Sequence, residues 1–175
     1  TSNHHSDDKL ANHLKKKNID FYRSSLNNVA KRFYEISKSL SFKSFLRING
    51  DSPLIDHNLI DFYIEKFNKN NYDILSNSYK KTFPKGQGIE IIKSKIFHNE
   101  FKKIKSKYDL EHVFPYFYRN KHQFKFKNIT YEKNLNNINF SVDTYSDFLR
   151  IRKIICKYKN KIPSLAKLIY DEKLQ

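Results

Sequence analysis

Residues 46–56, LRINGDSPLID, place an apolar, strand-like segment directly before a glycine and an acidic turn. Only 3 of the 175 residues are glycine, so Gly50 at the end of this segment marks a special turn rather than filler. Asp51 opens the turn, Pro53 stiffens it, and Asp56 is a good N-cap for a following helix. Open α/β folds bind their ligands where strands end at the carboxyl edge of the sheet. The stretch therefore predicts an α/β fold with a carboxylate at that edge.

Outward from this stretch, strand-like and helix-like periods alternate in both directions. We expect strands at 19–23, 42–48, 72–76, 89–92, 124–129 and 138–142. Helices are expected near residue 10, at 26–40, 57–69, 93–105, 108–118 and 145–159, and after Pro163, with a kink at Pro115. Short connections favour one domain over residues 1–175, a three-layer α/β fold with a mostly parallel sheet. The region from about 80 to 130 is less regular and is a candidate inserted or antiparallel portion.

The composition is strongly basic, with a formal net charge of +16. A basic balance favours nucleic acid or another anionic partner, whereas lysine and asparagine enrichment can also be a compositional habit of a genome. Only 6 of the 34 basic residues are arginine, the residue best suited to bidentate phosphate or base contacts. The lysines are also scattered along the chain. We therefore expect no specific nucleic-acid partner.

A membrane or disulfide-stapled class is not expected either. No apolar run approaches the roughly 20 residues of a membrane span, and no signal peptide is visible. A single cysteine, Cys156, cannot build a disulfide framework. These features favour a cytoplasmic protein without a membrane partner.

Seven segments, taken in order, resemble the cytidylyltransferases of the CMP-sugar synthetase type over nearly the whole chain. They are TSNHHSDDKL (1–10), FYRSSLNNVAKRFYE (21–35), LRINGDSPLID (46–56), NYDILSN (71–77), TFPKGQGIEI (82–91), EHVFPYFY (111–118) and NFSVDTYSDFLRIRKI (139–154). The branch of spore coat polysaccharide biosynthesis protein F resembles the chain most, and CMP-3-deoxy-manno-octulosonate synthetase is a more distant cousin. The resemblance implies a Rossmann-like nucleotide-diphospho-sugar transferase fold and transfer from CTP to a sugar in surface polysaccharide biosynthesis.

The family normally opens with a strand and a basic, glycine-containing loop that wraps the nucleotide. The sequence here starts at TSNHHSDD, which resembles the segment after the second strand of the family. We therefore expect an N-terminally incomplete domain, the C-terminal part of a cytidylyltransferase. A truncated gene product and a fragment are both consistent with this start.

Asp51 and Asp143 are the candidate catalytic and metal-binding residues. Each follows an expected strand, and Asp143 lies in a VDT that resembles the second metal-binding aspartate of the family. Mg²⁺ prefers one or two carboxylates together with water and substrate phosphate, so it is the expected cofactor. The alternatives are an Asx turn for Asp51 and a helix N-cap for Asp143. Asp56 and Asp147 are interpreted as a helix cap and a first-turn acid.

Arg23, Arg32, Arg47 and Gly50 are the candidate nucleotide-binding residues. The resemblance places Arg23 and Arg32 near the nucleotide, and guanidinium groups suit phosphates and base edges. Arg32 has the alternative of a solvated helix arginine. Arg47 lies inside an expected buried strand and therefore needs a partner there.

Glu90, Glu111, His112 and Tyr116 are the candidate sugar-binding residues. The TFPKGQGIE loop resembles the acceptor-proximal loop of the family, with Lys85 and Glu90 as candidates, and an ordinary turn is the alternative. The imidazole of His112 could bind an acidic sugar or assist proton transfer, and a structural histidine is its alternative.

The expected partners are CTP and a sugar, with an acidic sugar as one candidate, and a homodimer is a further candidate because relatives commonly dimerise. Two other classes of function stay open. One is a catalytically inactive, truncated paralogue that serves as an interaction module. The other is a basic nucleic-acid-binding domain, whose affinity would fall steeply with salt.

Overall fold

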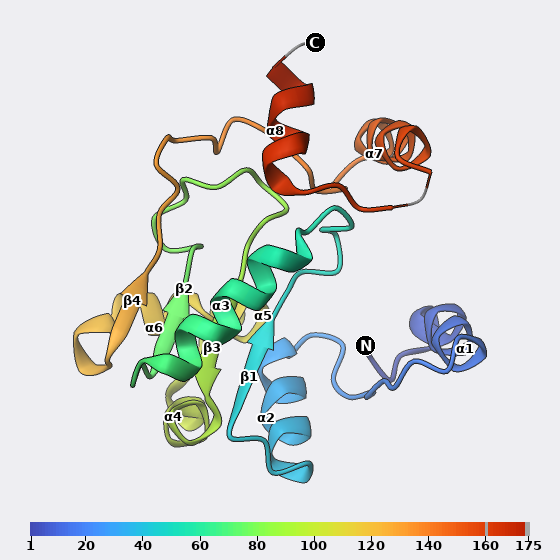
Figure 1. Ribbon diagram of the computed structural model, residues 1–175. Helices are drawn as coiled ribbons and strands as arrows, with labels where there is room; N and C mark the ends of the chain where they lie inside the picture. Colours follow the sequence, from blue (N-terminus) through green and yellow to red (C-terminus); the bar gives the residue numbers. More distant parts are fainter. Residues whose placement is uncertain (160, 174–175) are drawn as a thin grey trace. The chain divides into compact units, whose positions relative to one another are not determined.

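The computed structural model describes residues 1–159 and 161–173, which form an α/β fold with an open sheet flanked by helices (Figure 1). The strands are β1 (Ser44–Arg47), β2 (Ile74–Ser76), β3 (Glu90–Lys93) and β4 (Phe126–Asn128). The α-helices are α1 (Asp8–Lys16), α2 (Val29–Ser39), α3 (His57–Lys69), α4 (Ser94–Glu100), α5 (Lys107–His112), α6 (Pro115–Arg119), α7 (Tyr145–Lys157) and α8 (Leu165–Lys173). Three 3₁₀ turns, η1 (His5–Asp7), η2 (Phe101–Lys103) and η3 (Lys121–Gln123), complete the described elements.

The sheet has the order β1-β3-β2-β4, which confirms the expected α/β class. Strands β2 and β4 are parallel, with Ile74 opposite Phe126 and Ser76 opposite Asn128. The chain divides into two compact units. Unit 1 comprises residues 1–45 and 92–123, and unit 2 comprises residues 46–91 and 124–175.

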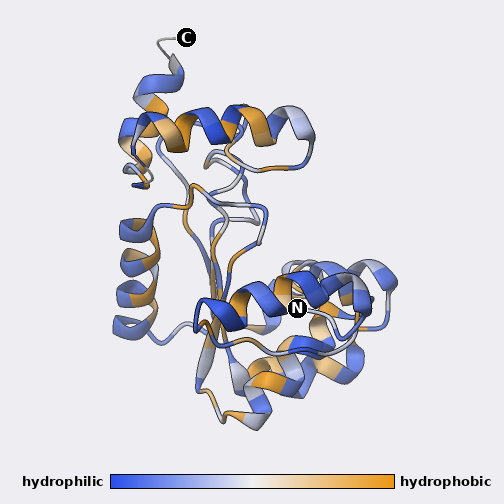
Figure 2. Cartoon of the chain, turned by 90° about the vertical axis from the view of Figure 1, so that its right-hand side faces the viewer, coloured by the Kyte–Doolittle hydropathy of each residue, from blue (hydrophilic) through white to orange (hydrophobic). Residues whose placement is uncertain are grey.

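Unit 2 contains two hydrophobic clusters among its described residues. Tyr63 and Phe67 on α3 pack with Leu75 of β2 and with Ile89 and Ile91 around β3. A second cluster joins loop residues to α7 and α8, and its members are Leu54, Phe83, Leu135, Ile138, Phe140, Ile151, Leu165, Leu168 and Ile169. Figure 2 shows hydrophobic and hydrophilic residues on opposite sides of the helices, the pattern that periodic sequence segments predict.

Unit 1 holds an aromatic core around α4 and α6. The Phe97 ring, which is fully buried, lies 5.8 Å from Phe117 and 5.1 Å from Phe45. The expected helix at 108–118 is split into α5 and α6, because Val113 has a φ of 69° and Pro115 starts the second helix. A proline lacks the N–H that a helix interior needs, so it occupies the first turn of α6 instead of kinking one long helix.

Two expected strands are absent from the described residues. Residues 19–23 form no strand, and only Ser24 makes an isolated parallel bridge, with Ser2. Residues 138–142 also form no strand, and Asn139 makes an isolated parallel bridge with Lys85. An apolar alternation predicts the face that a segment buries, whereas a ladder also requires a neighbouring strand of matching length.

Candidate functional site

Two segments of unit 2 that are distant in sequence meet through their backbones beside the candidate aspartates. The N–H of Val142 donates to the carbonyl oxygen of Asp51 over 2.8 Å. Asp143 is the next residue, and both Asp51 and Asp143 are exposed. We call these two residues the carboxylate rim. Asp51 follows β1 and is reached from the strand through Gly50, whereas Asp143 lies just before α7.

The loop at residues 84–88 holds the Asp143 segment in place. The N–H of Lys85 donates to Ile138, and the N–H of Phe140 donates back to Lys85, each over 2.9 Å. Gly86 has a φ of +85°, and a Cβ atom there would lie 2.7 Å from the carbonyl carbon of Phe140. Glycine is therefore required twice, by the backbone conformation and by the close approach.

Two buried amide side chains lock this loop to its neighbours. Gln87, which has no exposed surface, accepts from the N–H of Asp56 over 3.1 Å and donates to the carbonyl of Leu54 over 2.8 Å. Asn77 donates to the carbonyl of Gln87 over 2.7 Å and accepts from the N–H of Ile89 over 2.8 Å. The backbone around the rim is thus fixed by neutral amides. Sequence reasoning missed both residues, although the Gly-Gln-Gly context of Gln87 is the signal that could have found it.

The helix caps near the rim follow the expectations. Asp56 caps α3 by accepting from the N–H of Asn58 over 2.9 Å, and its other oxygen accepts from Leu165 at the start of α8 over 2.7 Å. Thr144, not Asp143, is the N-cap of α7, where it forms a capping box with Asp147. The capping alternative for Asp143 is therefore wrong, because its neighbour occupies that position.

The rim carboxylates each keep an oxygen without a protein partner among the described residues. One oxygen of Asp51 accepts from the hydroxyl of Ser52, and one oxygen of Asp143 accepts from the hydroxyl of Ser141, each over 3.0 Å. No cluster of three or more His, Cys, Asp or Glu side chains suited to a metal exists in the described part of the chain. Two exposed carboxylates fit the Mg²⁺ pattern in which substrate phosphate and water supply the other ligands.

An open polar pocket of about 470 Å³ lies in the same unit and shares the Lys85 loop. It is lined by Lys85 and by the amides of Asn134, Asn136 and Asn137. Amides and one ammonium group suit a ligand rich in hydroxyl groups that carries a negative charge.

Arg47 and Glu90 bind each other. Arg47 Nη1 lies 2.5 Å from Glu90 Oε2, and the exposed fractions of the two side chains are 17% and 6%. Arg47 therefore has the partner that its place in a strand requires, and this partner is Glu90, a candidate sugar-binding residue. This pair joins β1 to β3 within the sheet.

Two further candidate nucleotide ligands lie in unit 1. Arg23 donates to the carbonyls of Ser2 and His4 over 2.7 and 3.0 Å, and it forms an ion pair with Asp8. These contacts hold the segment before α1. Arg32 lies on α2, is half-buried, and makes no ion pair among the described residues.

The candidates at residues 111–116 also lie in unit 1. Glu111 and His112 are exposed at the end of α5, where the His112 ring lies 4.4 Å from Tyr108. The hydroxyl of Tyr116 donates to Glu100 over 2.6 Å. Burial, with the neighbouring Glu100 carboxylate, raises the pKa of Tyr116 to about 12, so the phenol stays protonated.

Comparison with known proteins points to one family. The profile of the family described as cytidylyltransferase matches residues 2–173. A cytidylyltransferase from Leptospira borgpetersenii serovar Hardjo-bovis superposes with a TM-score of 0.93 at 27% identity, covering 99% of this chain and 74% of that one. An uncharacterized protein of Methanocaldococcus jannaschii is 35% identical over 132 residues, which are 74% of this chain.

That match spans 53% of the archaeal protein, so the chain corresponds to about half the length of this curated relative. Among the described helices none is long and apolar enough to cross a membrane.

Proposed function

The chain belongs to the cytidylyltransferase family, and on this premise we propose that it takes part in forming a CMP-sugar from CTP, with release of pyrophosphate. We place it in surface polysaccharide biosynthesis, in the branch of spore coat polysaccharide biosynthesis protein F, as a cytoplasmic protein. A homodimer and an acidic sugar belong to the same proposal.

In this reaction a sugar hydroxyl oxygen forms a bond to the α-phosphorus of CTP. The bond from that phosphorus to the bridging oxygen of pyrophosphate breaks, and the hydroxyl proton leaves to solvent or a base. Such transfers depend on positioning and on neutralising negative charge that spreads over the phosphate oxygens.

The observation that carries the proposal is the backbone hydrogen bond between Val142 and Asp51. It joins the two segments that end in the rim carboxylates, as shared coordination of one cation requires. Asp51 and Asp143 would hold Mg²⁺, which when bound would neutralise phosphate charge. The protein contributes the fixed backbone, because the amides of Gln87 and Asn77 leave the rim little freedom to rearrange.

The open pocket beside the Lys85 loop supports a sugar as the acceptor. Its three asparagine amides can donate to and accept from sugar hydroxyls, and the ammonium group of Lys85 favours a sugar carboxylate. Glu90, by contrast, is neutralised by Arg47 and would act on the sugar only through the strand it supports. The contributions proposed for Arg23, Arg32, Arg47, Gly50, Glu111, His112 and Tyr116 rest on the resemblance.

The test is isothermal titration of the chain with CTP in the presence of Mg²⁺, using Asp51→Asn as the variant. The substitution keeps the size of the side chain and removes one charge, and we expect CTP affinity to fall about tenfold or more. Asp61→Asn is the matched control, because Asp61 is exposed on α3 in the same unit and carries no rim contact. Its affinity should equal that of the parent.

Equal affinity of Asp51→Asn and the parent would overturn the rim as the metal site. Absence of CTP binding by the parent would favour the interaction module. Salt-sensitive binding to generic duplex DNA that Asp51→Asn retains would favour the nucleic-acid domain.

A further inference from the structure

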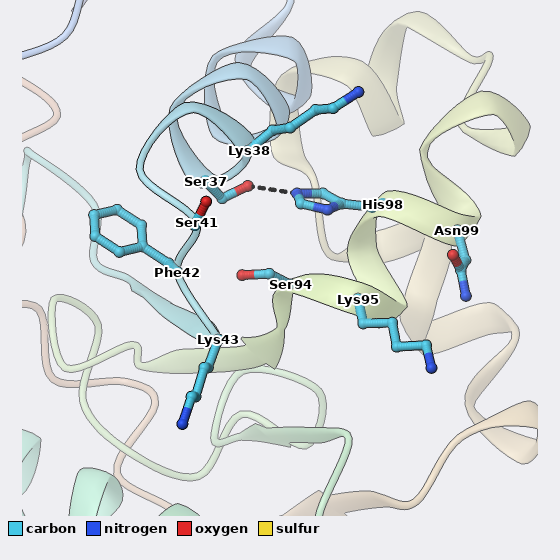
Figure 3. A pocket seen from close by; sticks show the side chains of 9 residues that line it. All are labelled: Ser37, Lys38, Ser41, Phe42, Lys43, Ser94, Lys95, His98 and Asn99. Atoms are coloured by element: carbon cyan, nitrogen blue, oxygen red, sulfur yellow. Dashed lines mark hydrogen bonds between the residues drawn. The ribbon is translucent and has the colours of Figure 1, made fainter.

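Unit 1 contains a second pocket, of about 550 Å³, that shares no residue with the carboxylate rim (Figure 3). We call it the lysine pocket. Its walls come from α2, from the turn before β1, and from α4, and the lining residues are Ser37, Lys38, Ser41, Phe42, Lys43, Ser94, Lys95, His98 and Asn99.

Ser94 presents a hydroxyl group that the protein leaves without a partner. The residue is 3% exposed, and its Oγ makes no hydrogen bond to any residue that the structure describes. Figure 3 shows this hydroxyl directed toward the middle of the pocket. A buried polar group without a partner is costly, so proteins rarely keep one without a use. The hydrogen-bonding capacity of this hydroxyl is therefore left unused by the described residues.

A hydrogen-bonded pair of side chains also lines the lysine pocket. The Oγ of Ser37 lies 2.9 Å from Nε2 of His98, and Ser37 is fully buried on α2. Burial, with Lys38 nearby, lowers the pKa of His98, so its imidazole is neutral near pH 7. The described lining of the pocket contains no carboxylate that would compete for these groups.

The charge around the pocket has one sign. Lys38, Lys43 and Lys95 lie on three sides of the pocket in Figure 3, with their ammonium groups directed away from its middle, and its described lining includes no aspartate or glutamate. Lys43 and Lys95 form no ion pair among the described residues, and Lys38 contacts the Tyr34 ring at 5.6 Å. Lysine stems are flexible, so their ammonium groups can turn toward an anion in the pocket.

The turn that forms one wall is held in place by backbone hydrogen bonds. Phe42 donates to Ser37 over 3.1 Å and Ser41 donates to Lys38 over 3.3 Å, which together close α2 as a Schellman motif. Phe42 contributes an exposed aromatic ring to the pocket. The volume exceeds what a bare phosphate needs and falls in the range of small-molecule sites.

We propose that the lysine pocket binds the phosphate group of a small phosphorylated metabolite, with the Ser94 hydroxyl as a hydrogen-bond donor, the lysines as charge partners, and Phe42 beside the organic part. This site lies outside the residues assigned to cytidylyl transfer and does not depend on that activity. Phosphate is the chemistry that uses a neutral donor and several cations together.

The experiment is an NMR titration of the His98 imidazole in the full chain, without CTP or Mg²⁺ and at constant ionic strength. The probes are ribose 5-phosphate, inorganic phosphate and unphosphorylated ribose. We expect saturable shifts of His98 with the phosphorylated probes and none with ribose. Tighter binding of ribose 5-phosphate identifies a phosphorylated metabolite, and equal binding identifies free phosphate as the source.

Matched variants locate the binding. Lys95→Gln should weaken it about tenfold through loss of a charge-assisted contact, and Ser94→Ala about fivefold through loss of a neutral hydrogen bond. Lys105→Gln removes the same charge from an exposed lysine of unit 1 outside the pocket, and should leave affinity within twofold. Absence of saturable shifts, or an equal loss in Lys105→Gln and Lys95→Gln, would overturn the proposal.

Discussion

The carboxylate rim of unit 2 and the lysine pocket of unit 1 treat their buried polar groups in opposite ways. Around the rim, Gln87 and Asn77 each use a donor and an acceptor on neighbouring backbone. In the pocket, Ser37 is paired with His98, but the Ser94 hydroxyl has no partner among the described residues. Internal pairing fixes the geometry of a site, whereas an unpaired buried group leaves binding capacity for a ligand. The charges follow the same division, with carboxylates on the rim and lysines around the pocket.

Replacing Gln87 with leucine should have the largest effect on stability near the rim. Gln87→Leu conserves size but leaves the carbonyl of Leu54 and the N–H of Asp56 buried without their partner. We expect a loss of about 4 kcal/mol in the free energy of unfolding, measured by urea denaturation. Gln123→Leu, at an exposed position of η3, is the control and should change stability little. Similar losses in both variants would show that the hydrogen bonds of the Gln87 side chain do not stabilise the backbone around the rim.

Gly86→Ala tests the same loop through its backbone. A positive φ and a methyl group 2.7 Å from Phe140 should together cost about 3 kcal/mol. Gly50→Ala is a sharp control, because a Cβ atom there meets nothing within 4 Å. It should be neutral or stabilising by a few tenths of a kcal/mol, since alanine restricts the unfolded chain. The measurement is the midpoint of thermal unfolding of both variants. Equal midpoints would contradict the close approach of Gly86 to the backbone of Phe140.

In the lysine pocket, Ser94→Ala should raise the stability of the protein, whereas the two substitutions near the rim lower it. Removing a buried hydroxyl that has no partner should stabilise the ligand-free protein by about 1 kcal/mol. Ser37→Ala is the contrast, because that hydroxyl is paired with His98 and its loss should destabilise the protein. The free energy of unfolding of both variants is measured by denaturation in a buffer without phosphate. Destabilisation by Ser94→Ala would mean that the hydroxyl has an internal use.

The smallest expected effect is a loss of stability at low pH, through the contacts of Asp171 that join α7 to α8 in unit 2. Hydrogen bonds from Lys157, Tyr158 and Lys167 lower the pKa of Asp171 below its ordinary value. The contribution of this carboxylate to stability is therefore present above about pH 4 and is lost as the pH falls through the lowered pKa. Asp171→Asn should lower the thermal midpoint at neutral pH and approach the parent in strong acid. A gap that stays constant with pH would contradict this.

Sequence periodicity predicted most of the helices, although the expected helix at 108–118 is split into α5 and α6. The apolar residues of α3 recur at helical spacing, and Asp56 caps the helix as expected. The strands were harder to predict, since residues 19–23 and 138–142 have alternating patterns but form no ladder, and only isolated bridges occur at Ser24 and Asn139. Asp51 follows from a strand end and both candidate aspartates follow from the resemblance, whereas the Gly-Gln-Gly context of Gln87 is a weak signal by itself.

The order of motifs along the chain therefore determined the family, the α/β class and the acidic positions by itself, because local spacing and residue chemistry are written in the linear sequence. Only the tertiary structure decided that the Asp51 and Asp143 segments share a hydrogen bond, that Arg47 neutralises Glu90, and that Ser94 lies buried without a partner. These features depend on which distant segments exclude water from one another, and no local pattern specifies that.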